Sequence, residues 1–225
     1  SNLGSILRAA AAVHARVPEA RFAVGALHER HAARVREMMA ALGHELGGLD
    51  LEIAAGRTRS LIAEAACAIA VSGSVSLELL SARVPTVIVY RISSLAYVVQ
   101  SWCRRARFIT LVNLLGCPEP IQPARGVCHA PRDVEASDPE AVYPEFLAVQ
   151  DPASRLADHV VEWLCDPAAR DRTVARLEKI AADVAVAGSA ERAAAAVLAI
   201  AAGRPDQVPP SEKRTWSVVP AGHAA

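Results

Sequence analysis

A turn of small polar residues in the middle of the chain carries the residue types that bind anions and sugars. Ser72, Gly73 and Ser74 come directly after the apolar run Cys67 to Val71, and the next residues predict a helix from Ser74 to Ala82. A strand that turns into a helix in this way presents backbone N–H groups to an anion. Glu78 shares a helix face with Ser74, one turn earlier. This arrangement suits the phosphates and ribose of a nucleotide.

Further polar residues stand at the end of the next predicted strand and in a later motif. Tyr90 and Arg91 end the apolar strand pattern that begins at Pro85, and Asn113 stands in Val112-Asn113-Leu114-Leu115. At the carboxyl ends of parallel strands such side chains meet at one edge of a sheet, where α/β proteins bind their ligands.

Each of these residues also has a purely structural interpretation. A Ser-Gly-Ser sequence before a helix is most often an N-cap, and a carboxylate such as Glu78 is favoured near a helix N-terminus by the helix dipole. Arg91 could form an ion pair at a strand end, and Asn113 could satisfy its own backbone in a turn. The individual residues therefore leave their role open.

The elements that must position these residues alternate between helix and strand. Apolar spacing predicts helices at 3–17, 29–42, 56–65 and 74–82, with Pro18 closing the first and Gly43 forming a left-handed cap on the second. Strands are predicted at 21–27, 49–55, 67–71 and 85–90. Strands that are apolar throughout indicate a parallel, Rossmann-like α/β sheet with helices on both faces.

The C-terminal part is predicted to be helical, with the sheet ending well before it. Helices are expected at 152–165, 168–186 and 190–202, with breaks at Asp166-Pro167 and Gly188-Ser189. Residues 117–142 hold five prolines and read as an irregular insertion, and residues 203–225 as a disordered tail. We therefore expect one domain over residues 1–202.

The chain opens on a helix, although an α/β sheet ordinarily opens on a strand whose loop meets the ligand. We therefore expect a first, central strand to precede these residues, and the chain to be the C-terminal part of a longer protein. Residues 1–225 alone are expected to be only marginally stable.

Composition narrows the classes of function. The 225 residues are 52% apolar, and 24 basic residues balance 24 acidic ones, which argues against a nucleic-acid partner. Five irregularly spaced cysteines indicate reduced thiols in the cytoplasm. Neither a signal peptide nor a membrane-spanning run is apparent. Cys117, Cys128 and His129 lack the paired spacing of a zinc site, and no Walker loop or nucleophile elbow occurs, so no metal or cofactor is expected.

Taken together, the motifs resemble the lipid-A-disaccharide synthase family. The specific part is Ala66 to Glu78, then Val84-Pro85-Thr86-Val87-Ile88-Val89-Tyr90-Arg91, then Val112 to Leu115. Tyr143-Pro144-Glu145-Phe146-Leu147 resembles the family's Pro-Glu-Leu-Leu-Gln motif. The resemblance runs from about Leu3 to Ala202, without the insertion and the tail.

The resemblance implies the C-terminal, donor-binding half of an inverting glycosyltransferase of the GT-B architecture. Such an enzyme transfers 2,3-diacylglucosamine from UDP to 2,3-diacylglucosamine 1-phosphate, giving the lipid A disaccharide 1-phosphate and UDP without a metal. It would work in the cytoplasm, peripherally on the inner membrane; whether it is a homodimer is left open. The motif positions that would bind the UDP-sugar are Ser72, Gly73, Ser74, Glu78, Tyr90, Arg91, Asn113 and Glu145.

The sequence also departs from the family's pattern. The family's Gly-Ser-Arg loop would precede Ser1, as would the N-terminal domain expected to supply the acceptor site and the catalytic base. This chain alone is therefore expected to be inactive. Val112 replaces a proline, and Ala148 replaces a glutamine, at two motif positions.

Residues 94–108 are predicted to form a largely apolar helix with a basic end. Trp102 is followed by Arg104, Arg105 and Arg107, a composition typical of an interface with anionic lipid. A packed helix whose cations stabilise its C-terminus is the alternative. We predict that these four residues face the membrane.

Two other functions remain open at this stage. The chain could be the donor half of another GT-B transferase, or a related epimerase, that uses soluble UDP-N-acetylglucosamine; dependence on acyl chains would separate the two. It could also be a non-catalytic nucleotide-sugar-binding module. The sequence preceding Ser1 would decide between a module and an enzyme.

Overall fold

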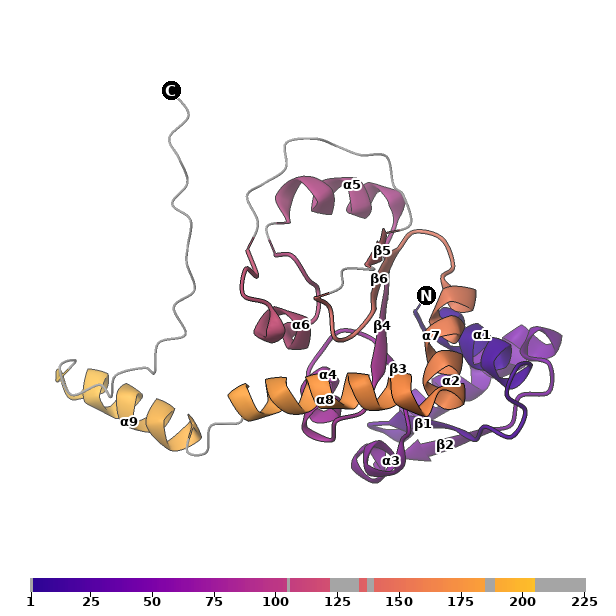
Figure 1. The fold of residues 1–225 in the computed structure, drawn as a ribbon, viewed down its shortest axis with the longest axis horizontal. Coiled ribbons are helices and arrows are strands. Elements are labelled where there is room, and N and C mark those ends of the chain that lie inside the picture. Colours follow the sequence, from indigo (N-terminus) through magenta and orange to yellow (C-terminus); the bar gives the residue numbers. More distant parts are fainter. Residues whose placement is uncertain (1, 105, 122–133, 137–139, 185–188, 205–225) are drawn as a thin grey trace.

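The computed structural model describes residues 2–104, 106–121, 134–136, 140–184 and 189–204 and has an α/β architecture (Figure 1). Its first half alternates as predicted, with every boundary within three residues of the expected one. The elements are α1 (Asn2–His14), β1 (Phe22–Ala26), α2 (Glu29–Leu42), β2 (Leu51–Ala55), α3 (Thr58–Glu64), β3 (Ala68–Ala70), α4 (Val75–Ser81) and β4 (Thr86–Arg91).

The second half contains α5 (Ser94–Cys103), α6 (Leu111–Gly116), β5 (Val134–Ala136), β6 (Glu145–Ala148), α7 (Ala153–Cys165), α8 (Pro167–Val184) and α9 (Ser189–Ala201). The three C-terminal helices are confirmed. The expectation that the sheet ends well before them is wrong, because β6 immediately precedes α7. Four residues are too few to show a strand pattern, and the sheet contacts of β6 are all distant in sequence.

Four local expectations also need correction. The helix predicted over 94–108 ends at Cys103, since Arg104 is extended (φ −73°, ψ 117°) at the start of a run of like charges. The short helix α6 was not predicted, and β5 lies inside the region expected to be irregular. Gly43 has a positive φ (47°) but is not left-handed helical; after a 3₁₀ turn (Gly43–Leu46), Gly47 adopts that conformation.

The strands form two parallel groups. In one, β1 pairs with β2, from Phe22 opposite Leu51 to Ala26 opposite Ala55. In the other, the order is β3-β4-β6-β5, parallel except for the antiparallel β5. Ile88 of β4 lies opposite both Ala70 and Glu145, which sets the register of the second group.

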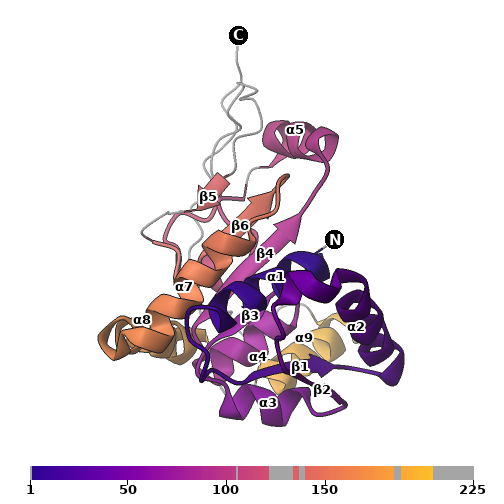
Figure 2. The same ribbon diagram turned by 90° about the vertical axis from the view of Figure 1, so that its right-hand side faces the viewer.

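Helices cover both faces of the strands, as predicted for a Rossmann-like sheet. On one face, α1 and α7 pack on alternate side chains of the second group, including Val87, Val89 and Phe146. On the other face, Ile88 packs with α4, α6 and α8. Figure 2 shows α1 and α7 on the near side of β4. Apolar side chains are therefore packed on both faces of these strands. This packing holds the loops at the strand ends rigidly.

The helix α5 projects from the rest of the fold (Figures 1 and 2). Its Tyr97 is buried, but Leu95, Val99 and Trp102 are 74%, 55% and 64% exposed. Across the described residues, none of the helices combines the length and apolar character needed to cross a bilayer. Apart from β5 and a few flanking residues, the proline-rich region lies outside the described residues, as does almost all of the predicted tail, so the expectations about those parts are untested.

Candidate functional site

The Ser72–Ser74 turn lies where β3 meets α4, as the sequence predicts. The Ser72 hydroxyl is partly buried and donates a hydrogen bond to the Ile109 carbonyl at 3.3 Å. Ser74 stands before α4 but makes no side-chain cap. Instead, the Ser76 hydroxyl donates to the Gly73 carbonyl at 2.7 Å. The simple N-cap interpretation of Ser74 therefore lacks its defining hydrogen bond, while Gly73, Ser74 and Glu78 are all exposed.

Tyr90 and Arg91 end β4 on opposite faces of the strand. Tyr90 follows the direction of Ile88, toward the face of α4 and α6, and is 39% exposed. Arg91 follows Val89, toward the face of α1 and α7. Its backbone N–H donates to Asn2 Oδ1 at 2.6 Å, and its guanidinium donates to the Val149 carbonyl at 3.1 Å. Arg91 thus joins the start of α1 to the loop after β6.

Glu145 and Asn113, the two remaining predicted site residues, form one buried network. Asn113 Nδ2 donates to Glu145 Oε1 at 2.8 Å and to the Tyr143 carbonyl at 2.7 Å. Asn113 Oδ1 accepts the backbone N–H groups of Val142 and Tyr143, both at 2.9 Å. Asn113 is 1% exposed and Glu145 3%. Asn113 therefore satisfies the backbone of a distant segment, which differs from the local turn role that its sequence context suggested.

The Glu145 carboxylate also anchors the backbone that reaches the Ser72 turn. Its oxygens accept the N–H groups of Ile109 and Thr110, each at 2.7 Å. Because the Ile109 carbonyl accepts from Ser72, the Ile109–Thr110 segment bridges β6 and the turn after β3. Ile109 and Thr110 were not predicted from the sequence, since a role played by backbone atoms leaves no signal in side-chain types.

The structure thus places several predicted site residues on one face of the sheet and Arg91 on the other. Ser72, Tyr90, Asn113 and Glu145 share the face of the sheet covered by α4 and α6. Arg91 lies on the opposite face, although both faces converge at the carboxyl edge of the strands. This edge is where parallel α/β sheets bind their ligands.

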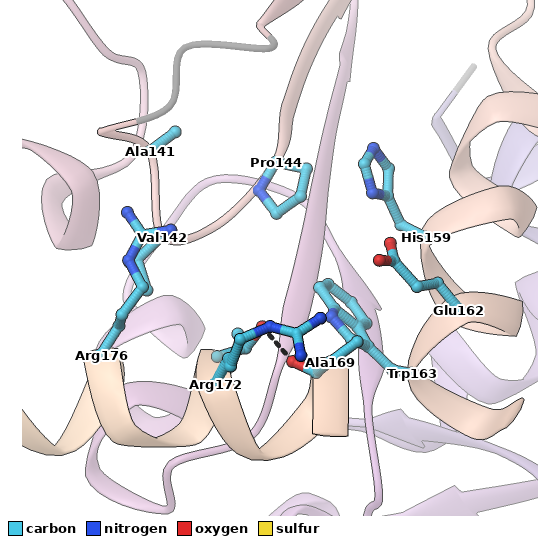
Figure 3. A pocket seen from close by; sticks show the side chains of 10 residues that line it. Ala141, Val142, Pro144, His159, Glu162, Trp163, Ala169, Arg172 and Arg176 are labelled. Atoms are coloured by element: carbon cyan, nitrogen blue, oxygen red, sulfur yellow. Dashed lines mark hydrogen bonds between the residues drawn. The ribbon is translucent and has the colours of Figure 1, made fainter. Parts of the chain in front are cut away.

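A cavity of about 290 Å³ lies elsewhere, between α7, α8 and residues 141–144 (Figure 3). It adjoins the amino end of β6 and is lined by none of the predicted site residues. Both arginines that line it have protein partners. A guanidinium nitrogen of Arg172 lies 3.8 Å from Asp166 Oδ2, and Arg176 donates to the Glu140 carbonyl at 2.9 Å. The cavity is therefore separate from the carboxyl edge.

In the described part of the chain, no cluster of three or more His, Cys, Asp or Glu side chains is placed to hold a metal ion. Cys128 and His129 lie outside the described residues. Burial raises the pKa of the Cys67 thiol to about 11, so this cysteine at the start of β3 is a neutral packing group.

The predicted membrane-facing residues divide into two groups. Trp102 and Arg104 are exposed at the end of α5. Arg107 instead turns back to the fold: its side chain is 21% exposed and pairs with Glu140, and its backbone N–H donates to the Pro120 carbonyl at 2.9 Å. Arg105 lies outside the described residues.

Comparison with known proteins agrees with the motifs. The family model for lipid-A-disaccharide synthetase matches residues 1–124. Similar proteins include the lipid-A-disaccharide synthases of Geobacter sulfurreducens (26% identity over 86% of this chain and 43% of the relative), Anaeromyxobacter sp. strain K (28%, 88% and 45%) and Thiobacillus denitrificans (31%, 84% and 44%). The chain spans less than half the length of these relatives.

Proposed function

Since this chain belongs to the lipid-A-disaccharide synthase family, we propose that it is the donor-binding part of a glycosyltransferase. The complete enzyme would transfer 2,3-diacylglucosamine from UDP to 2,3-diacylglucosamine 1-phosphate, with inversion at the anomeric carbon and release of UDP. The family match supports lipid A synthesis as the process. The donor, the acceptor and the GT-B division of labour are parts of the proposal.

One observation carries the assignment of the donor to this half. The Ser72–Ser74 turn and Tyr90 lie at the carboxyl ends of adjacent parallel strands, where Gly73, Ser74 and Tyr90 are exposed. Backbone N–H groups there would face the diphosphate, and Glu78 would accept from the ribose hydroxyls. Such preformed donors stabilise the charge that develops on a departing UDP.

We assign different roles to the remaining motif residues. Arg91 would contribute a positive charge beside the diphosphate from the neighbouring strand end. Asn113 and Glu145 would position the site, because their polar atoms are already bonded to Ile109, Thr110 and residues 142–143. A direct contact of either with the donor is not needed for their motif positions to matter.

The proposal can be tested by measuring the transferase activity of the complete protein that contains this chain. With UDP-diacylglucosamine as donor, Glu78→Ala and Arg91→Ala are expected to lower kcat/KM at least tenfold, since each removes a charged contact with the donor. Glu64→Ala and Arg36→Ala, exposed on α3 and α2, are the matched controls. Near wild-type donor use by both site variants would refute the assignment. Equal use of UDP-N-acetylglucosamine without acyl chains would favour the alternative transferase or epimerase.

We also propose that α5 contacts the membrane that carries the lipid substrates. Leu95, Val99 and Trp102 recur at intervals of four and three residues, so they form one exposed apolar stripe, and Arg104 follows it. Such a stripe with a basic end suits a bilayer containing anionic lipid. Leu95→Ser/Trp102→Ser is expected to weaken sedimentation of the complete protein with vesicles containing phosphatidylglycerol. Exposed Val197→Ser on α9 serves as the control, and unchanged sedimentation of the double variant would contradict the proposal.

A further inference from the structure

The last residue of β4 lies beyond the end of the neighbouring strand β3. β3 ends at Ala70, opposite Ile88, whereas β4 continues to Arg91. The Ile88 N–H donates to the Pro144 carbonyl, on the side of β6. N–H groups alternate between the two edges of a strand, and Arg91 follows Ile88 at an odd interval. The Arg91 N–H therefore points to the other side, where β3 has already ended.

The side chain of Asn2, at the start of α1, takes the place of a β3 carbonyl at this point. Its Oδ1 accepts the Arg91 N–H at 2.6 Å. This bond also defines the orientation of the amide, because a backbone N–H requires an acceptor oxygen. Asn2 thus holds the end of β4 on the side that faces β3 and the turn after it, which begins at Ser72.

The guanidinium of Arg91 is held from the opposite side. It donates to the Val149 carbonyl, in the loop after β6, at 3.1 Å. In the described part of the chain no carboxylate pairs with this guanidinium, whereas Arg8, Arg16 and Arg36 each form an ion pair. A guanidinium that is bonded to a neutral oxygen keeps its charge available to an anion.

A further contact closes a circuit of hydrogen bonds through α1. Arg8 lies on the same helix as Asn2 and donates from Nε to Asp151 Oδ2 at 2.6 Å. Asp151 belongs to the same loop as Val149. The helix α1 is therefore bonded both to the end of β4 and to the loop that holds the guanidinium, so these three parts keep a fixed relation to one another.

We infer that Asn2 is a positioning residue for the sugar-nucleotide donor and acts through Arg91. This inference rests on the proposed function, in which Arg91 contributes a positive charge beside the diphosphate. With its backbone held by Asn2 and its tip by Val149, the arginine side chain is ordered before the donor arrives. The conformational entropy of ordering it is then not lost on binding, which strengthens the contact with the diphosphate.

A double-mutant cycle in the complete protein tests this role. Asn2→Ala is expected to raise the donor KM about three- to tenfold, the effect of one hydrogen bond, with kcat and the acceptor KM changed by less than about twofold. In an Arg91→Ala background, Asn2→Ala should change the donor KM by less than about twofold, because the group that it positions is gone. A merely structural role would lower activity equally in both backgrounds.

Amide hydrogen exchange in the same protein measures the contact itself. Exchange of the Arg91 amide should be roughly tenfold faster in Asn2→Ala and stay slow in Asn2→Asp, whose carboxylate keeps an acceptor oxygen in the same place. Arg16→Ala is the matched control, because it removes an ion pair with Asp158 of α7 beyond the other end of α1. It should leave both the Arg91 amide and the donor KM unchanged.

The possible outcomes separate this inference from the proposed function. If Arg91→Ala impairs donor use and Asn2→Ala does not, the inference is overturned and the proposed donor site is unaffected. An equal loss from Asn2→Ala with and without Arg91 would also overturn it, because Asn2 would then act on the fold alone. If Arg91→Ala leaves donor use unchanged, the assigned role of Arg91 fails and the inference fails with it. Asn2→Leu, which keeps the side-chain volume without the acceptor, replaces Asn2→Ala in the cycle if the alanine variant folds poorly.

Discussion

Glu145 and Glu78 are expected to respond oppositely when each is changed to glutamine. Both carboxylates were predicted to bind the donor, yet Glu145 is 3% exposed and accepts three hydrogen bonds from the protein, while Glu78 is exposed on α4. Glutamine retains the shape of glutamate, removes its charge and replaces one acceptor oxygen with an amide donor. The substitution therefore separates positioning from binding.

The cost of Glu145→Gln follows from its contacts. If the remaining oxygen keeps Thr110 N–H and Asn113 Nδ2, the new amide group faces the Ile109 N–H, and two donors meet without an acceptor. The hydrogen bonds from Thr110 and Asn113 would then be accepted by a neutral oxygen, and the buried Ile109 N–H would be unpaired. Together these two changes should lower the free energy of unfolding by about 2–4 kcal/mol. Glu78→Gln should change that free energy by less than about 0.5 kcal/mol, as is usual for an exposed side chain.

Urea denaturation followed by circular dichroism measures the first effect, and donor KM in the complete protein measures the second. Glu145→Gln should lower the denaturation midpoint with an unchanged slope, and Glu78→Gln should raise the donor KM without moving the midpoint. If Glu145→Gln were as stable as the wild type and impaired only donor use, the positioning role would be refuted. A loss of stability in Glu78→Gln would equally contradict the exposed, ligand-facing role.

Three further predictions concern the remaining fold. Burial would raise the pKa of Asp151, but hydrogen bonds from Ser5, Arg8 and the Ala153 N–H, together with the charge of Arg8, outweigh burial and lower the pKa from its ordinary value of 3.8. Asp151→Asn should therefore lower the thermal midpoint at pH 7, and the difference should shrink as the pH falls below about 4, since the stabilisation is lost as the carboxylate is protonated. Cys67, whose pKa burial raises to about 11, should resist iodoacetamide at pH 8 under conditions that label exposed Cys103; equal labelling would show that β3 is open to solvent. Leu177→Ala on α8, a fully buried site, should cost about 3–5 kcal/mol in urea denaturation, and a cost below about 1 kcal/mol would show that α8 is not packed on the sheet.

The sequence predicted the repeating part of the fold because each element there carries its own local pattern. The helix 29–42 agrees residue for residue, since its apolar spacing and Gly43 define both ends. The strand pattern of 85–90 is equally plain, because β4 is buried on both faces. Position in the sheet, not local pattern, defines β6: its four residues pair with β4 and β5, and nothing in Glu-Phe-Leu-Ala alone predicts a strand.

The candidate site was predictable in its exposed parts and not in its buried ones. The turn at Ser72 and the end of β4 follow from strand patterns and small polar residues. Asn113 and Glu145 lie 32 positions apart in the sequence and bond each other directly. Their side chains also accept hydrogen bonds from the backbone N–H groups of four other residues. Motif resemblance identified both residues, but only the hydrogen bonds distinguish holding the site from contacting the donor.

These contacts also connect the proposed membrane-facing helix with the proposed donor edge. α5 connects to the fold through two anchored segments: Ile92 N–H donates to the Ala148 carbonyl, and on the other side Ile109 N–H donates to Glu145. Arg107, paired with Glu140, adds a further anchor before Ile109. Ile109 also accepts the hydrogen bond of the Ser72 hydroxyl, so the segment that follows α5 is bonded both to Glu145 and to the proposed donor edge.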